Sequence, residues 1–168
     1  MTMADDYARR NPAINWPEGF KPEGADLYAH NELFIRAPVE RVWSLLIDAT
    51  NWPSWYPNCW DIRILTPGHE VLKAGSRFRW RTFTLDIETH VNEFTPNERI
   101  GWFSFPTPDT AQFYNAKLLE PREGGTNVVI EEVANGPLPE QFAREDEEAM
   151  HRGHEMWLAV LRWAAESR

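Results

Sequence analysis

The feature that most constrains this chain is its C-terminal segment, 138–168, which has the pattern of one long amphipathic helix. Pro139 falls in the first turn, where proline is tolerated because its missing amide hydrogen would have no intrahelical partner. At the helical period, the apolar and small residues of the segment form a single stripe. The stripe consists of Phe142, Ala149, Met150, Gly153, Met156, Trp157, Val160, Leu161 and Ala164. A helix with one apolar face must lie on a broad partner, so the segment predicts a sheet beneath it.

Two residues of this helix bear on function. Gly153 interrupts the stripe, although glycine in a helix costs about 1 kcal/mol relative to alanine. It indicates a close backbone approach, a bend, room for a ligand or simply a tight packing contact. Asp146 falls on the apolar face between Phe142 and Met150. It is either an exposed residue of the first turns, which we favour, or a polar anchor inside a cavity.

The chain upstream of this helix predicts an antiparallel sheet, because short alternating segments rich in aromatic residues are separated by turn residues. A helix over 38–48 and a rigid aromatic turn over 51–57 separate the first two strands. The predicted strands span 26–36, 61–65, 76–83, 84–94, 99–105, 111–119 and 126–133. A curved sheet that wraps the C-terminal helix satisfies this order and leaves a cavity between the two layers.

Two neighbouring strands carry charged residues at alternate positions. Three basic residues on the first face two carboxylates and a histidine on the second, namely Arg77, Arg79 and Arg81 opposite Asp86, Glu88 and His90. Because alternation places these side chains opposite the apolar face, the pattern predicts a solvent-facing charge ladder across the strands.

Composition excludes several classes of partner. The formal net charge of −9 argues against nucleic acid or membrane surfaces as the main partner, since both attract basic proteins. No apolar run approaches the length of a membrane span, and the N-terminus lacks the apolar core of a signal peptide. The single Cys59 cannot form an intrachain disulfide. We therefore expect a one-domain protein of the cytoplasm. Its nine Trp and nine Phe suit a core or a pocket for a flat apolar ligand.

Several short motifs, taken in order, resemble those of the START/Bet v 1-like superfamily, and most nearly its polyketide cyclase/dehydrase and lipid-transport group. The motifs are IRAPVERVWSLLID at 35–48, WPSW at 52–55, AGSRF at 74–78, PNERIGW at 96–102, GGT at 124–126 and WLAVL at 157–161. The resemblance covers residues 26–168.

The resemblance implies an α+β helix-grip fold. In such a fold, a curved seven-stranded antiparallel sheet wraps around a long C-terminal helix, and two short helices follow the first strand. It also implies an internal cavity for a lipid, sterol, polyketide or aromatic metabolite. The superfamily shares no catalytic motif, so the catalytic residues stay unknown. We expect residues 26–168 to form this ligand-binding domain. Residues 1–25 would form a proline-rich arm that covers the cavity mouth or joins a homodimer.

Strand and helix parity predicts which residues line the cavity. We expect the turn after the first helix to form the mouth, with strand residues along one wall and helix residues along the other. The predicted ligand-binding residues are Trp55, Tyr56, Phe78, Trp80, Thr82, Trp102, Tyr114, Asp146, Met150, Gly153, His154 and Trp157.

No metal and no cofactor are expected. The Glu148, His151 and His154 spacing is that of a di-iron helix, but such sites need a second helix of this kind. In addition, the periodicity points His151 away from the apolar stripe. Cys59 lies in an aromatic segment and is read as a small buried apolar residue.

Three functions stay open. The first is binding or transport of a hydrophobic small molecule. The second is a cyclase or dehydratase that uses cavity acid–base residues, with Asp146, His154, Tyr114 and Thr82 as candidates. The third is docking of a protein partner by a chain whose cavity is vestigial.

Overall fold

The computed structural model describes residues 1–167 and contains one curved, seven-stranded antiparallel sheet. The strands follow the order β1-β7-β6-β5-β4-β3-β2 across the sheet, and every neighbouring pair is antiparallel. Their bounds are β1 (Leu27–Ile35), β2 (Cys59–Ile64), β3 (Arg77–Thr82), β4 (Leu85–Thr95), β5 (Arg99–Thr107), β6 (Gln112–Arg122) and β7 (Gly125–Asn135). The predicted α+β helix-grip fold is confirmed.

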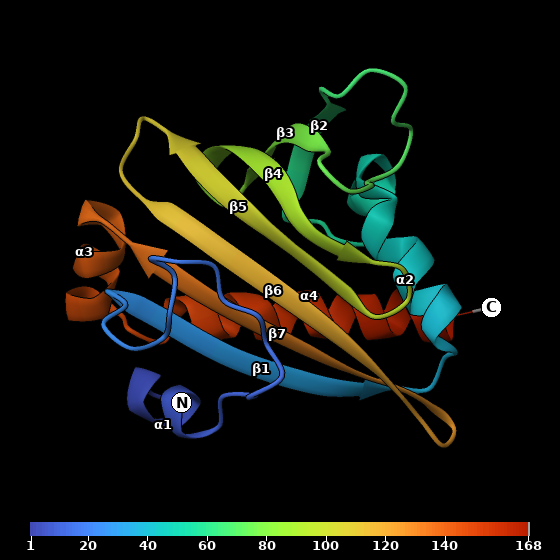
Figure 1. Ribbon diagram of the computed structural model, residues 1–168, viewed down its shortest axis with the longest axis horizontal. Helices are drawn as coiled ribbons and strands as arrows, with labels where there is room; N and C mark the ends of the chain where they lie inside the picture. The colour runs from blue at the N-terminus through green and yellow to red at the C-terminus, as the bar shows by residue number, and fades with distance from the viewer. Residues whose placement is uncertain (168) are drawn as a thin grey trace.

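Helices lie at the ends of the sheet and on its concave face. After β1 come α2 (Val39–Ile47) and the short 3-10 helix η1 (Ala49–Ser54), which are the two short helices expected there. The long helix α4 (Ala149–Glu166) crosses behind the sheet in the view of Figure 1. Within residues 1–167, no helix is both long enough and apolar enough to cross a membrane.

The prediction of one continuous C-terminal helix is wrong. The segment forms α3 (Pro137–Glu145) and then α4, which are separated by a break at Asp146 with φ −162° and ψ 73°. The break lets α3 pack against the ends of β1 and β7 while α4 follows the concave face. Arg168, the last residue of the predicted helix, lies outside the described residues.

The main core lies between the concave face and α4. Its centre is Trp52 of η1, whose ring centroid lies 5.1 Å from that of Trp157 on α4 and 5.2 Å from that of Trp80 on β3. Phe78 and Trp102 also contact Trp52, at 5.7 and 6.0 Å. This aromatic cluster holds the sheet, η1 and α4 together.

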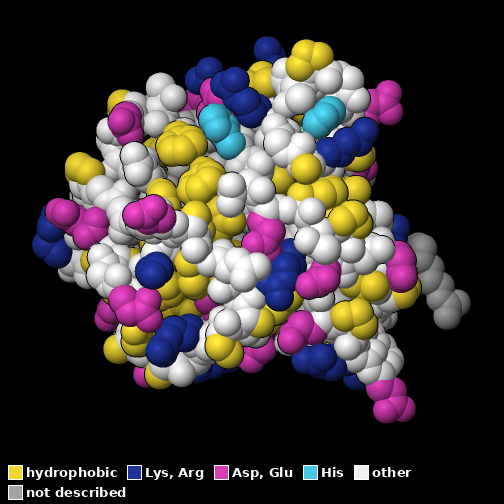
Figure 2. Space-filling view, in the orientation of Figure 1, with side chains coloured by type: hydrophobic (Ala, Val, Ile, Leu, Met, Phe, Trp, Pro, Cys, Tyr) yellow, Lys and Arg dark blue, Asp and Glu magenta, His cyan; other side chains and the backbone are white. Residues whose placement is uncertain are grey.

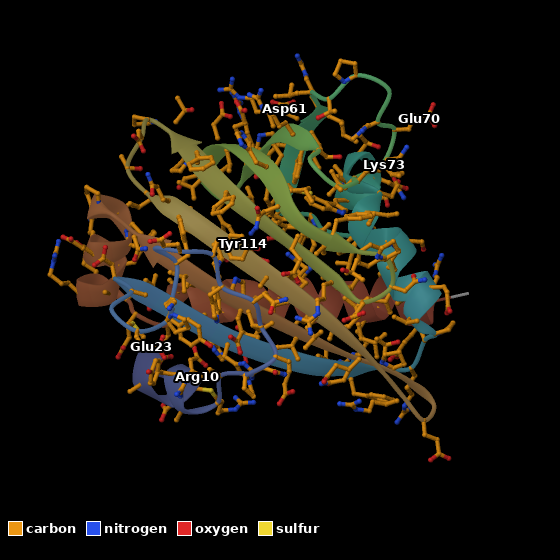
Figure 3. All side chains as sticks on the ribbon, in the orientation of Figure 1. Arg10, Glu23, Asp61, Glu70, Lys73 and Tyr114 are labelled. Carbon is orange, nitrogen blue, oxygen red and sulfur yellow. The ribbon has the colours of Figure 1, made fainter. Side chains whose placement is uncertain are left out.

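The N-terminal arm covers the convex face of the sheet. Helix α1 (Met3–Ala8) packs on β1, and the arm then runs in front of β1 and β7 in Figure 1. Trp16 and Phe20 of the arm pack edge-on or tilted against Tyr114 of β6, both at 6.1 Å. Arg10 and Glu23 lie near each other in the arm, 3.8 Å apart (Figure 3). The part of the arm after α1 therefore covers the side of the sheet opposite α4, whereas α1 lies beside β1 and contacts His151 of α4.

The predicted charge ladder is present on the outer side of β3 and β4. Arg77 pairs with Glu88, and Arg79 pairs with Asp86 at 2.9 Å. Arg81 lies 3.7 Å from the same aspartate. Figure 2 shows basic and acidic side chains together along this edge of the molecule. Such exposed pairs add little stability but keep this outer face of the sheet polar.

Candidate functional site

The concave interior is lined by aromatic side chains at the end where β3 meets β4. Trp157 of α4 lies 5.1 Å from Trp55 and 4.7 Å from Tyr56, measured between ring centroids. Six of the twelve predicted ligand-binding residues come together in this interior and contact one another or Trp52. They are Trp55, Tyr56, Phe78, Trp80, Trp102 and Trp157.

Two of these indole rings carry buried N–H groups with no hydrogen-bond acceptor among residues 1–167, those of Trp55 and Trp157. Two neighbouring indoles, those of Trp80 and Trp52, do have acceptors. Trp80 donates to Thr89 Oγ1 at 3.0 Å, and Trp52 donates to the carbonyl oxygen of Leu46 at 3.2 Å. An unpaired buried donor costs about 1–3 kcal/mol. The two rings are neighbours, with their centroids 5.1 Å apart.

A lysine side chain is buried in the same interior. Lys117 of β6 is 4% exposed, and its Nζ lies 3.6 Å from the ring centroid of Trp102 and 5.7 Å from that of Trp157. Nζ donates a hydrogen bond to Asn115 Oδ1 at 2.5 Å. Burial lowers the pKa of Lys117 to about 7, and the charge of Glu132 opposes this shift. The amine is therefore partly neutral near physiological pH.

A chain of hydrogen bonds continues from Asn115 towards α4. The Asn115 amide donates to Glu132 Oε2 at 2.8 Å, and His154 Nε2 lies 2.6 Å from the same oxygen. Burial by itself would raise the pKa of Glu132. The hydrogen bonds and positive charge of His154, together with Asn115 and Lys117, outweigh burial and hold this pKa below its usual value. Glu132 is thus an anion that lies between His154 and the asparagine that holds Lys117.

The chain ends at the arm. Asn31 Nδ2 donates to the carbonyl oxygen of His151 at 3.2 Å, which fixes the orientation of the amide. Asn31 Oδ1 therefore faces His154 Nδ1, 3.1 Å away. His154 therefore has an oxygen within hydrogen-bond distance of each ring nitrogen. His151 Nδ1 in turn donates to the buried Asp6 of α1 at 2.9 Å. Burial raises the pKa of Asp6, and the hydrogen bond from His151 opposes this.

Three further predicted residues differ in how deeply they are buried. Thr82 is buried at the end of β3, whereas Met150 and Gly153 are half-buried on α4. A side chain added at Gly153 would meet the ring of Phe83 at 3.6 Å. Phe83 is 48% exposed and has φ +50°, so it forms a strained turn between β3 and β4 that covers the start of α4.

Two of the predicted residues lie outside the interior, and one residue excluded from the core is buried. Tyr114, labelled in Figure 3, lies on the convex face beside the arm. Asp146 is exposed and pairs with Arg152 at 2.5 Å. His151, which the periodicity pointed away from the core, is buried because α1 covers that side of α4.

Most residues of this chain of hydrogen bonds were not predicted from the sequence. They are Asp6, Asn31, Asn115, Lys117 and Glu132. One signal was available. Asn115 and Lys117 stand two apart in a segment that is otherwise apolar or aromatic, so both point to the same face of β6. The partners of this pair come from distant parts of the chain and left no local pattern.

The structure also contains two surface hollows. One, of about 320 Å³, lies between β1, α4 and the arm and is lined by Arg9, Leu33, His151, Leu158 and Arg162 among others. The other, of about 350 Å³, lies within the arm. The aromatic residues of the interior line neither of these two hollows. Among the described residues, no cluster of three or more His, Cys, Asp or Glu side chains is placed to hold a metal ion.

Comparisons with known proteins agree with this fold. The chain matches the family model described as "Activator of Hsp90 ATPase homolog 1-like protein" over residues 36–166. Hypothetical protein jhp0584 from Helicobacter pylori is similar in structure, with a TM-score of 0.85 and 25% identity over 94% of this chain and 98% of that chain. No curated protein matches the sequence.

Two further solved structures share the fold at lower identity. The di-domain ARO/CYC BexL from the BE-7585A biosynthetic pathway has a TM-score of 0.68 and 18% identity, over 87% of this chain and 52% of that chain. Ara h 8.0201 has a TM-score of 0.61 and 13% identity, over 83% and 98%. These likenesses establish the fold, and the family match covers most of the chain. The protein therefore belongs to the Activator of Hsp90 ATPase homolog 1-like family, within the START/Bet v 1-like superfamily.

Proposed function

We propose that this protein binds a flat, apolar small molecule that carries an oxygen acceptor, in the interior between the sheet and α4. The observation that carries the proposal is the pair of buried, unpartnered indole N–H groups of Trp55 and Trp157, within an aromatic lining. Aromatic walls give a flat ligand contact area, and a few placed donors fix its orientation. A cytoplasmic site of action is part of the proposal.

The entrance lies at the turn between β3 and β4. Phe83 covers Gly153 there, and both are more exposed than the aromatic residues behind them. A ligand that enters must move this turn away from α4. The positive φ of Phe83 makes the closed turn strained, which lowers the cost of moving it.

One of the solved structures that share the fold supports this proposal. BexL is an ARO/CYC protein of a biosynthetic pathway, and about half of its length has the fold of this chain. A ring-closing or dehydrating activity is the second candidate function, because a buried amine and a histidine–carboxylate pair lie in the interior. Two of the expected acid–base residues, Tyr114 and Asp146, lie outside it, so this candidate would depend on Lys117, Glu132 and His154.

Native mass spectrometry on freshly purified protein, followed by solvent extraction, tests the proposal directly. We expect a stoichiometric apolar adduct, or uptake of one compound from a library of aromatic ketones and acids. Trp157→Phe keeps most of the ring and removes the N–H group, so it should weaken binding about tenfold, as loss of one buried hydrogen bond implies. Trp163→Phe is the matched control, because Trp163 is 64% exposed.

A second variant tests the entrance. Gly153→Trp should block ligand uptake and leave the protein folded, because its side chain would occupy the place of Phe83 at the start of α4. Equal binding by the wild type, Trp157→Phe and Gly153→Trp would show that the ligand, if any, binds elsewhere.

A further inference from the structure

We propose that Lys117 is a nucleophilic amine that forms an imine with the carbonyl group of an apolar aldehyde or ketone bound in the interior. This inference rests on the proposed function, because the same aromatic interior must first admit the ligand. It adds a covalent step and a substrate class to that function.

The contacts of Lys117 distinguish it from a structural ion pair. Its Nζ donates to the neutral amide oxygen of Asn115, and among residues 1–167 no carboxylate oxygen lies within 4.0 Å of it. Glu132 instead interacts with Asn115 and His154, so that Asn115 links it to Lys117. A buried ammonium without a direct carboxylate partner is strongly disfavoured. The free amine, which is the nucleophilic form, is correspondingly populated near neutral pH.

The surroundings of the amine fit a carbonyl compound on a flat body. Nζ lies against the face of Trp102 and near Trp157, so a planar ligand that reached it would stack on indole rings. The unpartnered N–H groups of Trp55 and Trp157 are donors suited to a carbonyl oxygen. Hydrogen bonds to that oxygen would draw electron density from the carbonyl carbon and favour attack on it.

The reaction is balanced without a further reactant. The lone pair of Nζ forms a bond to the carbonyl carbon while the C=O π bond breaks, and the oxygen gains a proton as the nitrogen loses one. The resulting hydroxyl group leaves with a second proton as water, and a C=N bond forms. One amine and one carbonyl compound thus give one imine and one water, with no oxidation or reduction.

The sequence makes the test clean, because the chain has three lysines, Lys21, Lys73 and Lys117. Lys21 and Lys73 are exposed and serve as internal controls. The protein is incubated with 2-naphthaldehyde and sodium cyanoborohydride, which reduces any imine to a stable amine. The adduct is then counted by intact mass and located by peptide mapping. A parallel titration with 2-naphthalenemethanol, followed by tryptophan fluorescence, measures binding without reaction.

We expect Lys117 to be modified in a one-to-one adduct, at least about tenfold faster than Lys73 at pH 7. The free-amine fraction is about one half for a pKa near 7 and below one in a thousand for an ordinary lysine. The rate at Lys117 should reach half its maximum near pH 7. Trp157→Phe should slow the reaction at Lys117 and leave that at Lys73 unchanged.

The outcomes separate the two proposals. If 2-naphthalenemethanol binds but Lys117 reacts no faster than Lys73, the imine is overturned and the proposed function stands. If neither compound binds nor reacts in the interior, both fall. Lys117→Met should bind 2-naphthalenemethanol and lose the fast adduct. The wild-type labelling pattern decides the matter even if that variant fails to fold.

Discussion

Replacing Lys117 by methionine should change how the free energy of unfolding depends on pH. Burial lowers the pKa of this amine from its ordinary value of 10.5 to about 7 in the folded protein. Between these two values the unfolded chain binds more protons at this side chain than the folded protein does, so wild-type stability rises with pH. Below the lower value both states are protonated, and the full cost of burying the charge is present. Above the higher value both are neutral, and that cost is gone.

The magnitude follows from the same two values. At about 1.36 kcal/mol for each pKa unit, the fall from 10.5 to about 7 corresponds to about 5 kcal/mol over the whole window. Between pH 7 and about pH 9 the wild-type protein should gain about 2 kcal/mol, because the folded amine is still half protonated at the start of that interval. Methionine keeps most of the length of the lysine side chain and does not titrate. The variant should therefore lack this gain in stability.

Urea denaturation of the wild type and Lys117→Met, at constant ionic strength from about pH 6 to about pH 9, measures the effect. The variant should have its greatest advantage at the acidic end, and that advantage should shrink by about 3 kcal/mol over the whole range, about 2 kcal/mol of it above pH 7. Lys73→Met, which alters an exposed lysine, controls for the loss of one positive charge. A difference between wild type and Lys117→Met that stays constant over this range would refute the reasoning, since it would mean that Lys117 has an ordinary pKa.

Three further substitutions test the packing, the arm and the charge ladder. Gly125→Ala should lower the free energy of unfolding by about 1–3 kcal/mol in urea, because its Cβ would lie 2.1 Å from the carbonyl oxygen of Ile35. Asp6→Asn removes the charged partner of His151 and should cost about 1.5–3 kcal/mol, with faster amide hydrogen exchange confined to the arm. Arg79→Ala breaks an exposed ion pair and should leave the urea midpoint of unfolding nearly unchanged. A large loss in the last variant, or none in the first two, would contradict these readings.

Most of the fold could be predicted from the sequence, because it depends on local patterns. Alternation, aromatic residues and turn residues marked the seven strands, and the apolar stripe marked the helix beneath them. The break at Asp146 left no such mark, because the surrounding acidic residues tolerate a helix and no glycine or proline stands there. Tertiary packing decides it, since α3 follows the ends of β1 and β7 while α4 lies along the concave face.

Tyr114 of β6 lies on the face opposite to the one that strand parity predicted. All residues from Tyr114 to Leu119 are buried, because α4 covers one face of this strand and the arm covers the other. A strand buried on both faces loses the alternation of apolar and polar residues that reveals its orientation. The register decides instead, and it pairs Trp102 with Asn115 and Phe103 with Tyr114. Tyr114 therefore faces the arm.

The chain of hydrogen bonds could not be predicted because its members are distant in sequence. Asp6 and His151 are 145 residues apart, and Asn31 and His154 are 123 apart. Taken alone, each of these residues has an ordinary interpretation. A histidine can be half-exposed on a helix, and an acidic residue can lie in a surface arm. Only the register of β1, β6 and β7 against α4 brings them into one network.

The two ends of that network differ in a way that favours a binding role over a purely structural one. At the arm end, His151 and Asp6 satisfy each other, as a network that only stabilises a fold must do. Other buried polar atoms without a partner among residues 1–167 lie on the convex face, where the Tyr28 hydroxyl group faces the Glu131 carboxylate.

At the interior end, the Lys117 amine donates to a neutral amide, and two buried indole N–H groups have no acceptor among residues 1–167. Each of these features costs stability, and a hydrophobic side chain at position 117 would avoid the largest of them. An interior selected for stability alone would not keep all three in one place. A buried amine and unpartnered indole donors in the same aromatic interior are the physical reason to look for the ligand there.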